Sequence, residues 1–141
     1  MNKSKVFLGG TYAETTWRDE LCRALAVDYF NPIVEDWTPE CQAEEQHQKA
    51  DLCDIHLYVI TSDMQGVFSI AEAIDSSHNN SKHTILHVIP DGFSRAQLKS
   101  LLATVNMVRD NGGSAYIDAD LHRTARVINY CFSQIEGYPA P

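Results

Sequence analysis

Short apolar runs alternate along the chain with longer stretches that have the character of helices. Five runs have the β-prone composition of buried strands, at residues 6–8, 27–30, 55–60, 84–89 and 115–117. Five stretches have helical spacing of apolar residues or open on helix-capping residues, at about 15–26, 38–50, 67–77, 94–109 and 120–135. The pattern therefore predicts a strand followed by a helix, repeated five times.

This alternation predicts parallel strands, because a crossover helix must join each strand to the next. Five such units in 141 residues fit one α/β domain that spans residues 1–141. We expect a flavodoxin-like, doubly wound five-stranded sheet of order 2-1-3-4-5 with helices on both faces. Residues 136–141 are expected to lie extended on the surface.

The charge balance narrows the range of partners. Eleven basic and 19 acidic residues give a net charge of −8, which argues against a nucleic-acid polymer or an anionic membrane as the main partner. No apolar run approaches the roughly 20 residues that cross a bilayer, and the first ten residues lack the apolar region of a signal peptide. We therefore expect a cytoplasmic protein.

The four cysteines, Cys22, Cys41, Cys53 and Cys131, are scattered and form no C-x-x-C pair. A cytoplasmic chain of this size does not need disulfides, so we predict buried free thiols. The six histidines show no spacing typical of metal ligands, and no metal site is expected.

Ligands of open parallel sheets bind beyond the carboxyl ends of the strands, where the strand order reverses. In this chain that place falls after the first and third strands. The candidate residues there are Gly9, Gly10, Thr11, Tyr12, Asp63, Gly66, Ser69 and Glu72. The two adjacent glycines let backbone amides approach a sugar or phosphate, although they also suit a plain turn. Neither G-x-G-x-x-G nor a Walker lysine is present, so a dinucleotide fold or a phosphate-loop NTPase is not supported.

Glu72 is the most informative of these residues, because its neighbours in the predicted helix are apolar. Such an acid is either a reactive group in a cleft or the solvated corner of a helix. Ser69 lies one turn earlier and can share its face or cap the helix.

Several aromatic and charged residues are candidates for substrate binding. Trp17, Trp37 and Tyr12 can stack on a base, and Trp37 follows Asp36 in the loop after the second strand. Arg18 can pair with a phosphate or with an acid on its own helix. The acidic stretch with Glu40, Glu44 and Glu45 reads as a solvated helix face. Composition and spacing alone do not decide between the binding and structural roles of these residues.

Six motifs occur in the order of a known family: residues 6–11 (VFLGGT), 17–18 (WR), 29–32 (YFNP), 35–37 (EDW), 58–60 (YVI) and 66–73 (GVFSIAEA). They resemble the nucleoside 2-deoxyribosyltransferase-like family, in particular its small phage and bacterial branch. The resemblance implies a flavodoxin-like domain that handles the N-glycosidic bond of a 2′-deoxynucleoside or its monophosphate without a cofactor. It also implies a homodimer or larger homo-oligomer, Glu72 as the nucleophile, and the base pocket near the end of the acidic stretch.

A glutamate suits this chemistry, because a carboxylate can stabilise or trap the oxocarbenium-like sugar that forms as the base leaves. The trapped sugar then passes to another base or to water. Two positions differ from the family pattern. The family's sugar-binding acid falls on Gly66, so Asp63 fills that role only if its loop bends, and Phe7 replaces a tyrosine that orients the glutamate.

The alternatives to an N-glycosidic enzyme are a catalytically idle nucleotide-binding or sensing module and an NAD-type glycohydrolase. A response-regulator receiver is excluded, because the first strand ends in Gly-Gly-Thr rather than in acids.

Overall fold

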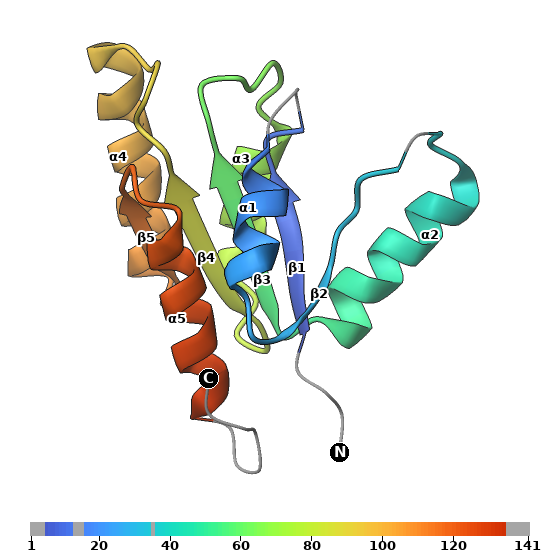
Figure 1. The fold of residues 1–141 in the computed structure, drawn as a ribbon. Coiled ribbons are helices and arrows are strands. Elements are labelled where there is room, and N and C mark those ends of the chain that lie inside the picture. The colour runs from blue at the N-terminus through green and yellow to red at the C-terminus, as the bar shows by residue number, and fades with distance from the viewer. Residues whose placement is uncertain (1–4, 13–15, 35, 135–141) are drawn as a thin grey trace.

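Five parallel strands form one sheet in the order β2-β1-β3-β4-β5 (Figure 1). The structure is a computed structural model, and it describes residues 5–12, 16–34 and 36–134. The strands are β1 (Lys5–Gly10), β2 (Asp28–Phe30), β3 (Ile55–Ile60), β4 (His83–Val88) and β5 (Ser114–Ile117). The helices are α1 (Trp17–Ala24), α2 (Pro39–His47), α3 (Phe68–Ser77), α4 (Arg95–Asp110) and α5 (His122–Ser133). The predicted fold, strand order and element order are confirmed.

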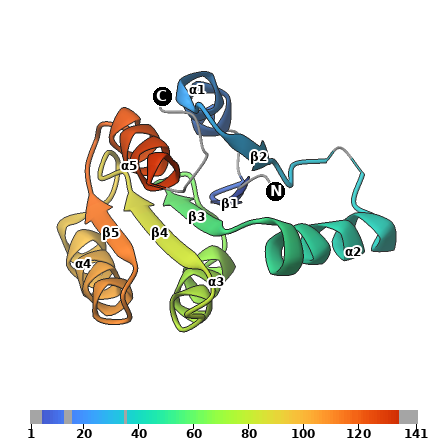
Figure 2. The ribbon, with the colours of Figure 1, turned by 90° about the horizontal axis from the view of Figure 1, so that it is seen from below.

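The helices cover both faces of the sheet, as predicted. Seen along the sheet, α1 and α5 lie on one face and α3 and α4 on the other (Figure 2). The core under α1 and α5 includes Trp17, Leu57 and Phe132, and the core under α3 and α4 includes Leu86 and Val105. Every residue of β3 is buried, as expected for the central strand of a parallel sheet.

Two features of the elements were not predicted. Strand β1 extends through both glycines to Gly10, so this pair is part of the strand rather than a turn after it. A π-helical turn, η1 (Gln48–Leu52), follows α2 directly. The predicted tail at 136–141 lies outside the described residues.

Helix α2 projects from the side of the sheet (Figures 1 and 2). Thr38 caps it by accepting a hydrogen bond from the Cys41 backbone N–H (3.1 Å), and Pro39 occupies its first turn. No residue of α2 is buried, so the helix is held mainly through its continuation into η1.

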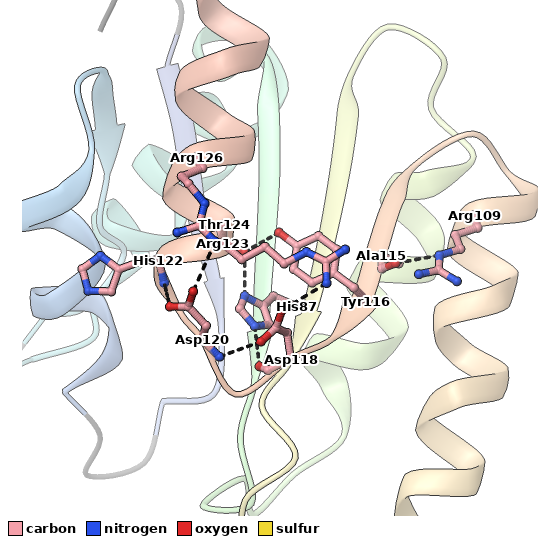
Figure 3. A network of polar contacts seen from close by, with 10 residues as sticks. All are labelled: His87, Arg109, Ala115, Tyr116, Asp118, Asp120, His122, Arg123, Thr124 and Arg126. Atoms are coloured by element: carbon pink, nitrogen blue, oxygen red, sulfur yellow. Dashed lines mark hydrogen bonds and ion pairs between the residues drawn. The ribbon is translucent and has the colours of Figure 1, made fainter.

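A network of polar side chains joins the ends of β4 and β5 to α5, away from the predicted site (Figure 3). His87 is fully buried, and its Nε2 lies 2.7 Å from the Asp118 carbonyl oxygen while its Nδ1 lies 2.6 Å from Thr124 Oγ1. A carbonyl only accepts, so Nε2 carries the proton, Thr124 donates to Nδ1, and the Tyr116 hydroxyl donates to Thr124 (2.5 Å). Arg123 stacks over Tyr116 and pairs with Asp118. These contacts anchor α5 to the sheet.

All four cysteines are free thiols, as predicted. Only Cys53 is buried, however, and the other three are half-buried. Among the helices of the described ranges, none combines the length and the apolar character needed to span a bilayer.

Candidate active site

Two neighbouring clefts lie against α3, one at the carboxyl ends of β1 and β3 and the other between α2 and α3, and Glu72 and Phe68 line both of them. The first, which we call the β1–α3 cleft, has a volume of about 390 Å³. Its other lining residues are Gly10, Thr11, Tyr12, Ile60, Met64, Gln65, Gly66 and Ser69. The second, the α2–α3 cleft, has a volume of about 410 Å³. Its other lining residues are Trp37, Gln42, Glu45, Gln46, Lys49, Ala71 and Asp75. Glu72 therefore stands at the junction of two hollows, each large enough for part of a small molecule.

The Glu72 carboxylate pairs with Lys49, which lies on η1. Lys49 Nζ is 2.6 Å from Glu72 Oε2, and the two side chains are 27% and 18% exposed. Burial alone would lower the pKa of Lys49, yet this pKa is raised because Tyr58 and Glu72 favour the charged ammonium. Glu72 therefore lines a cleft and is paired with a cation, which does not fit the solvated corner of a helix, and its reactivity stays a prediction.

The floor of the β1–α3 cleft is built where β1 passes very close to β3. Gly10 has φ +115°, and a Cβ atom there would lie 2.2 Å from the Val59 carbonyl oxygen. Gly9 is also required, since a Cβ atom there would lie 2.8 Å from the Tyr58 ring. Only glycine fits this approach, which lets Thr11 reach β3 and accept a hydrogen bond from the Thr61 backbone N–H (2.9 Å).

Arg18 supports this loop from behind. Its guanidinium is buried and donates to the carbonyl oxygens of Leu8 (3.2 Å), Thr11 (2.7 Å) and Gly10 (3.4 Å). Burial lowers its pKa to about 10. Arg18 therefore donates to carbonyl groups of β1 and the following loop rather than to an acid of its own helix, and its pairing with a phosphate stays a prediction.

Ser69 joins helix α3, which carries Glu72, to this floor. Its hydroxyl donates to the Gly10 carbonyl oxygen (3.1 Å), and Val67 rather than Ser69 stands at the N-cap of α3. Ser69 therefore fixes the distance between α3 and β1, which sets how far Glu72 lies above the cleft floor.

Burial and charge also act on other groups around Glu72. The pKa of Glu45 is raised by burial and by the charge of Glu72. Burial raises the pKa of both Tyr12 and Tyr58 to about 12, so both hydroxyls keep their protons at neutral pH. The Tyr58 hydroxyl is buried and lies near Lys49 and Ser76, but no described residue meets it with hydrogen-bond geometry.

A buried histidine fixes the backbone that carries Lys49. His56 Nε2 lies 2.6 Å from the Lys49 carbonyl oxygen, and its Nδ1 lies 2.9 Å from Ser76 Oγ. Nε2 is therefore the donor, Ser76 donates to Nδ1, and Thr84 Oγ1 (2.6 Å) donates to Ser76. Ser76 lies one turn after Glu72, so this relay holds η1 and α3 at a fixed separation.

We expect this relay to make the fold sensitive to acid. Burial lowers the pKa of His56 to about 4, with the charges of Lys49 and Lys82 acting in the same direction and that of Asp54 opposing them. An unfolded histidine has a pKa near 6.5, so between pH 6.5 and 4 the unfolded chain binds the extra proton. The free energy of unfolding should therefore fall by about 3 kcal/mol as the pH drops through this window.

Urea unfolding at a series of pH values would measure this effect. Burial also lowers the pKa of His83 and His87, so the difference between wild type and His56→Gln isolates the contribution of His56. The exposed His47→Gln variant is the control, and an equal slope in wild type and His56→Gln would contradict the prediction.

The structure brings most of the predicted residues together. Gly10, Thr11, Tyr12, Gly66, Ser69 and Glu72 line the β1–α3 cleft, and Trp37 lines the α2–α3 cleft. Gly9 precedes Gly10 and lies outside the β1–α3 cleft, against the Tyr58 ring.

Three further predicted residues also line neither cleft. Trp17 is buried in the core, where its indole donates to the Thr11 carbonyl oxygen (3.1 Å), so it supports the loop instead of stacking on a base. Asp36 is exposed beside the start of α2. Asp63 is exposed, and its backbone N–H donates to Thr61 Oγ1 (3.3 Å).

Lys49 and Glu45 are among the site residues that the sequence did not single out. They lie four residues apart, so they share one face of the helix, and Lys49 is the only Lys or Arg between residues 38 and 50. A single cation in an acidic stretch was the sequence feature that could have identified Lys49 as a site residue. Glu45 was interpreted as part of a solvated face, but it is half-buried in the α2–α3 cleft.

A further hollow, of about 460 Å³, lies at the opposite edge of the sheet. Two of its polar side chains hold neighbouring segments together: Lys82 donates to the Cys53 carbonyl oxygen, and His83 at the start of β4 pairs with Ser114 at the start of β5. Across residues 5–12, 16–34 and 36–134, no three His, Cys, Asp or Glu side chains are grouped to share a metal ion.

Fold and site together define a flavodoxin-like α/β protein that presents a carboxylate to small-molecule clefts at its sheet edge. Residues 3–91 match the family model described as nucleoside 2-deoxyribosyltransferase like, and this match covers more than half of the 141 residues. The chain belongs to this family, whose description implies a nucleoside as the small-molecule substrate. The match contains every residue that lines the two clefts. No curated protein and no solved structure matches the chain.

Proposed function

We propose that this protein transfers or hydrolyses the N-glycosidic bond of 2′-deoxynucleosides or their monophosphates, with Glu72 as the nucleophile. The observation that carries the proposal is the position of Glu72, a partly buried carboxylate where the two clefts meet. A substrate that spans both clefts would place the bond between its sugar and its base beside this residue.

The two clefts suit different parts of such a substrate. The β1–α3 cleft offers the Tyr12 and Ser69 hydroxyls and the backbone around Gly10 and Gly66, which are suitable partners for a sugar. The α2–α3 cleft offers the half-exposed Trp37 ring, which can stack on a base, and the amide groups of Gln42 and Gln46, which can hydrogen-bond to its edge. We therefore place the sugar in the first cleft and the base in the second.

The reaction proceeds in two displacements. A Glu72 oxygen bonds to C1′ of the sugar as the C1′–N bond breaks and the base leaves with the electron pair and takes up a proton. A second base or water then attacks C1′ and loses a proton to solvent, while the bond between C1′ and the Glu72 oxygen breaks and its electron pair returns to the carboxylate. The protein is a transferase if the acceptor is a base and a hydrolase if it is water.

Mass spectrometry of the intact protein, mixed with each deoxynucleoside and each monophosphate, tests the proposal. The expected result is an added deoxyribosyl mass, which peptide mapping assigns to Glu72, together with free base in solution. If no donor yields an adduct or free base while ligands still raise the melting temperature, the protein is a binding module instead.

Self-association belongs to the same proposal. Three large apolar side chains are between 55% and 74% exposed: Phe68 and Trp37, which line the clefts, and Val67, which precedes Phe68 at the start of α3. A second copy of the chain would cover them, and light scattering after size-exclusion chromatography would give the mass of a homodimer or larger assembly.

A further inference from the structure

Lys49 is the cation that contacts Glu72, and no role is assigned to it so far. Among the described residues that line the two clefts, it is the only Lys or Arg. Both members of the pair are mostly shielded from water, so their attraction is stronger than that of an exposed ion pair.

The position of the ammonium group is closely controlled. Lys49 Nζ lies 5.6 Å from the centre of the Phe7 ring and 5.7 Å from that of the Tyr58 ring, so aromatic faces flank it. The backbone of Lys49 is held by the hydrogen bond from His56. The two rings and the hydrogen bond from His56 therefore hold the Lys49 ammonium beside a carboxylate oxygen of Glu72. A surface ion pair is not fixed in place by contacts of this kind.

The two displacements affect this pair in opposite ways. In the first, Glu72 changes from a carboxylate to a neutral ester, so its attraction to Lys49 weakens as the transition state forms. In the second, the C1′–O bond breaks and the electron pair returns to Glu72, so the attraction strengthens. Only an interaction that is stronger in the transition state than in the ground state speeds a step.

We propose that Lys49 accelerates the release of the deoxyribosyl group from Glu72 by stabilising the carboxylate that re-forms. This inference rests on the proposed function. Lys49 keeps its proton and its charge throughout, and the bond that breaks is the one between C1′ and the Glu72 oxygen. When water is the acceptor, the water oxygen bonds to C1′ and its proton passes to solvent.

The consequence is a change in which step limits turnover. In Lys49→Met, which keeps the unbranched side chain up to the position of Cε and removes the charged ammonium, the adduct should still form on Glu72 but decay about 100-fold more slowly, the size of effect seen when one stabilising donor is removed. The steady-state fraction of adduct should therefore rise while turnover falls. Lys49→Arg keeps the charge, and its adduct should decay within about tenfold of the wild-type rate.

The matched control is Lys82→Met. Lys82 is also half-buried and hydrogen-bonded, to the Cys53 carbonyl oxygen (2.9 Å), but it lines the hollow at the other edge of the sheet. In Lys82→Met the adduct on Glu72 should form and decay as in the wild type.

The experiment loads each protein with a deoxynucleoside donor, removes the donor, and follows the intact mass against time. Circular dichroism melting confirms that each variant is folded. Ethylammonium added to Lys49→Ala should speed the decay of the adduct in proportion to its concentration, because a small cation can replace the missing charge but cannot repair a structural defect.

The outcomes separate this inference from the proposed function. If the wild type yields neither adduct nor free base, the proposed function fails and this inference fails with it. If the wild type forms the adduct and folded Lys49→Met forms none, or loses it as fast as the wild type does, the role of Lys49 is refuted while the nucleophile stands.

Discussion

Glu72→Gln is expected to lower the rate of base release by about three orders of magnitude or more and to abolish the covalent adduct. An amide has nearly the shape of a carboxylate, but it is a poor nucleophile and carries no charge to stabilise an oxocarbenium-like sugar. Loss of a nucleophile commonly has effects of this size, since the remaining groups cannot replace it. The measurement is release of free base by chromatography, with the intact mass recorded in parallel.

Asp75→Asn is the control for Glu72→Gln. Asp75 lies one turn further along α3 and lines the same α2–α3 cleft, but it is exposed and forms none of the hydrogen bonds seen for Glu72. Its activity should stay within a few-fold of the wild type. Equal activity of Glu72→Gln and wild type would show that another group carries the chemistry, whereas ligand binding without turnover in both proteins would indicate a binding module.

Gly10→Ala is expected to destabilise the fold by about 3 kcal/mol or more. The new methyl group would lie 2.2 Å from the Val59 carbonyl oxygen and 2.6 Å from the Val59 backbone nitrogen, and φ +115° is unfavourable for alanine. Relief of this overlap requires β1 to separate from β3, at the register Gly10↔Val59 in the centre of the sheet. The midpoint of urea unfolding should fall accordingly, or the variant should fail to accumulate as folded protein.

Gly66→Ala provides the comparison for Gly10→Ala in the same cleft. No atom lies within 4 Å of a Cβ atom built at Gly66, and its φ is outside the left-handed region, so stability should change by less than about 1 kcal/mol. If the two alanine variants were equally stable, the close approach of β1 to β3 would be disproved.

The fold was predictable because its signals are local and repeat. Each strand is a short apolar run, each helix has its own spacing or caps, and strict alternation admits few topologies. Thr38-Pro39 is an example, because the capping hydroxyl and the proline at the start of α2 are adjacent in the sequence and act there in the structure. The position of Glu72 in a cleft was predictable for a different reason, since an acid among apolar neighbours stands out, whereas its role as the nucleophile stays a prediction from the family resemblance.

What could not be predicted depends on contacts between distant segments. Lys49 and Glu72 are 23 residues apart, and nothing local indicates that η1 turns one toward the other. Arg18 follows Trp17 at the start of a helix, where an arginine commonly faces water, and its burial depends on the path of β1 beneath it. Asp63 was assigned to the site by its place after β3, yet the residues that reach the cleft are the next three in the loop, Met64, Gln65 and Gly66.

Because of the π-helical turn η1, the geometry of the site depends on the exact number of residues in the segment that joins α2 to β3. In η1 the Cys53 N–H donates to the Gln48 carbonyl oxygen five residues earlier (2.8 Å), which accommodates one more residue than an α-helical turn does. Deleting a single residue there would restore α-helical geometry and rotate α2 by about 100° about its axis. No buried side chain on α2 would oppose that rotation, so Glu45 would leave the cleft while the sheet kept its pairing. In this segment a one-residue deletion therefore changes the site more than many substitutions would, and the spacing between Thr38 and Ile55 is itself under constraint.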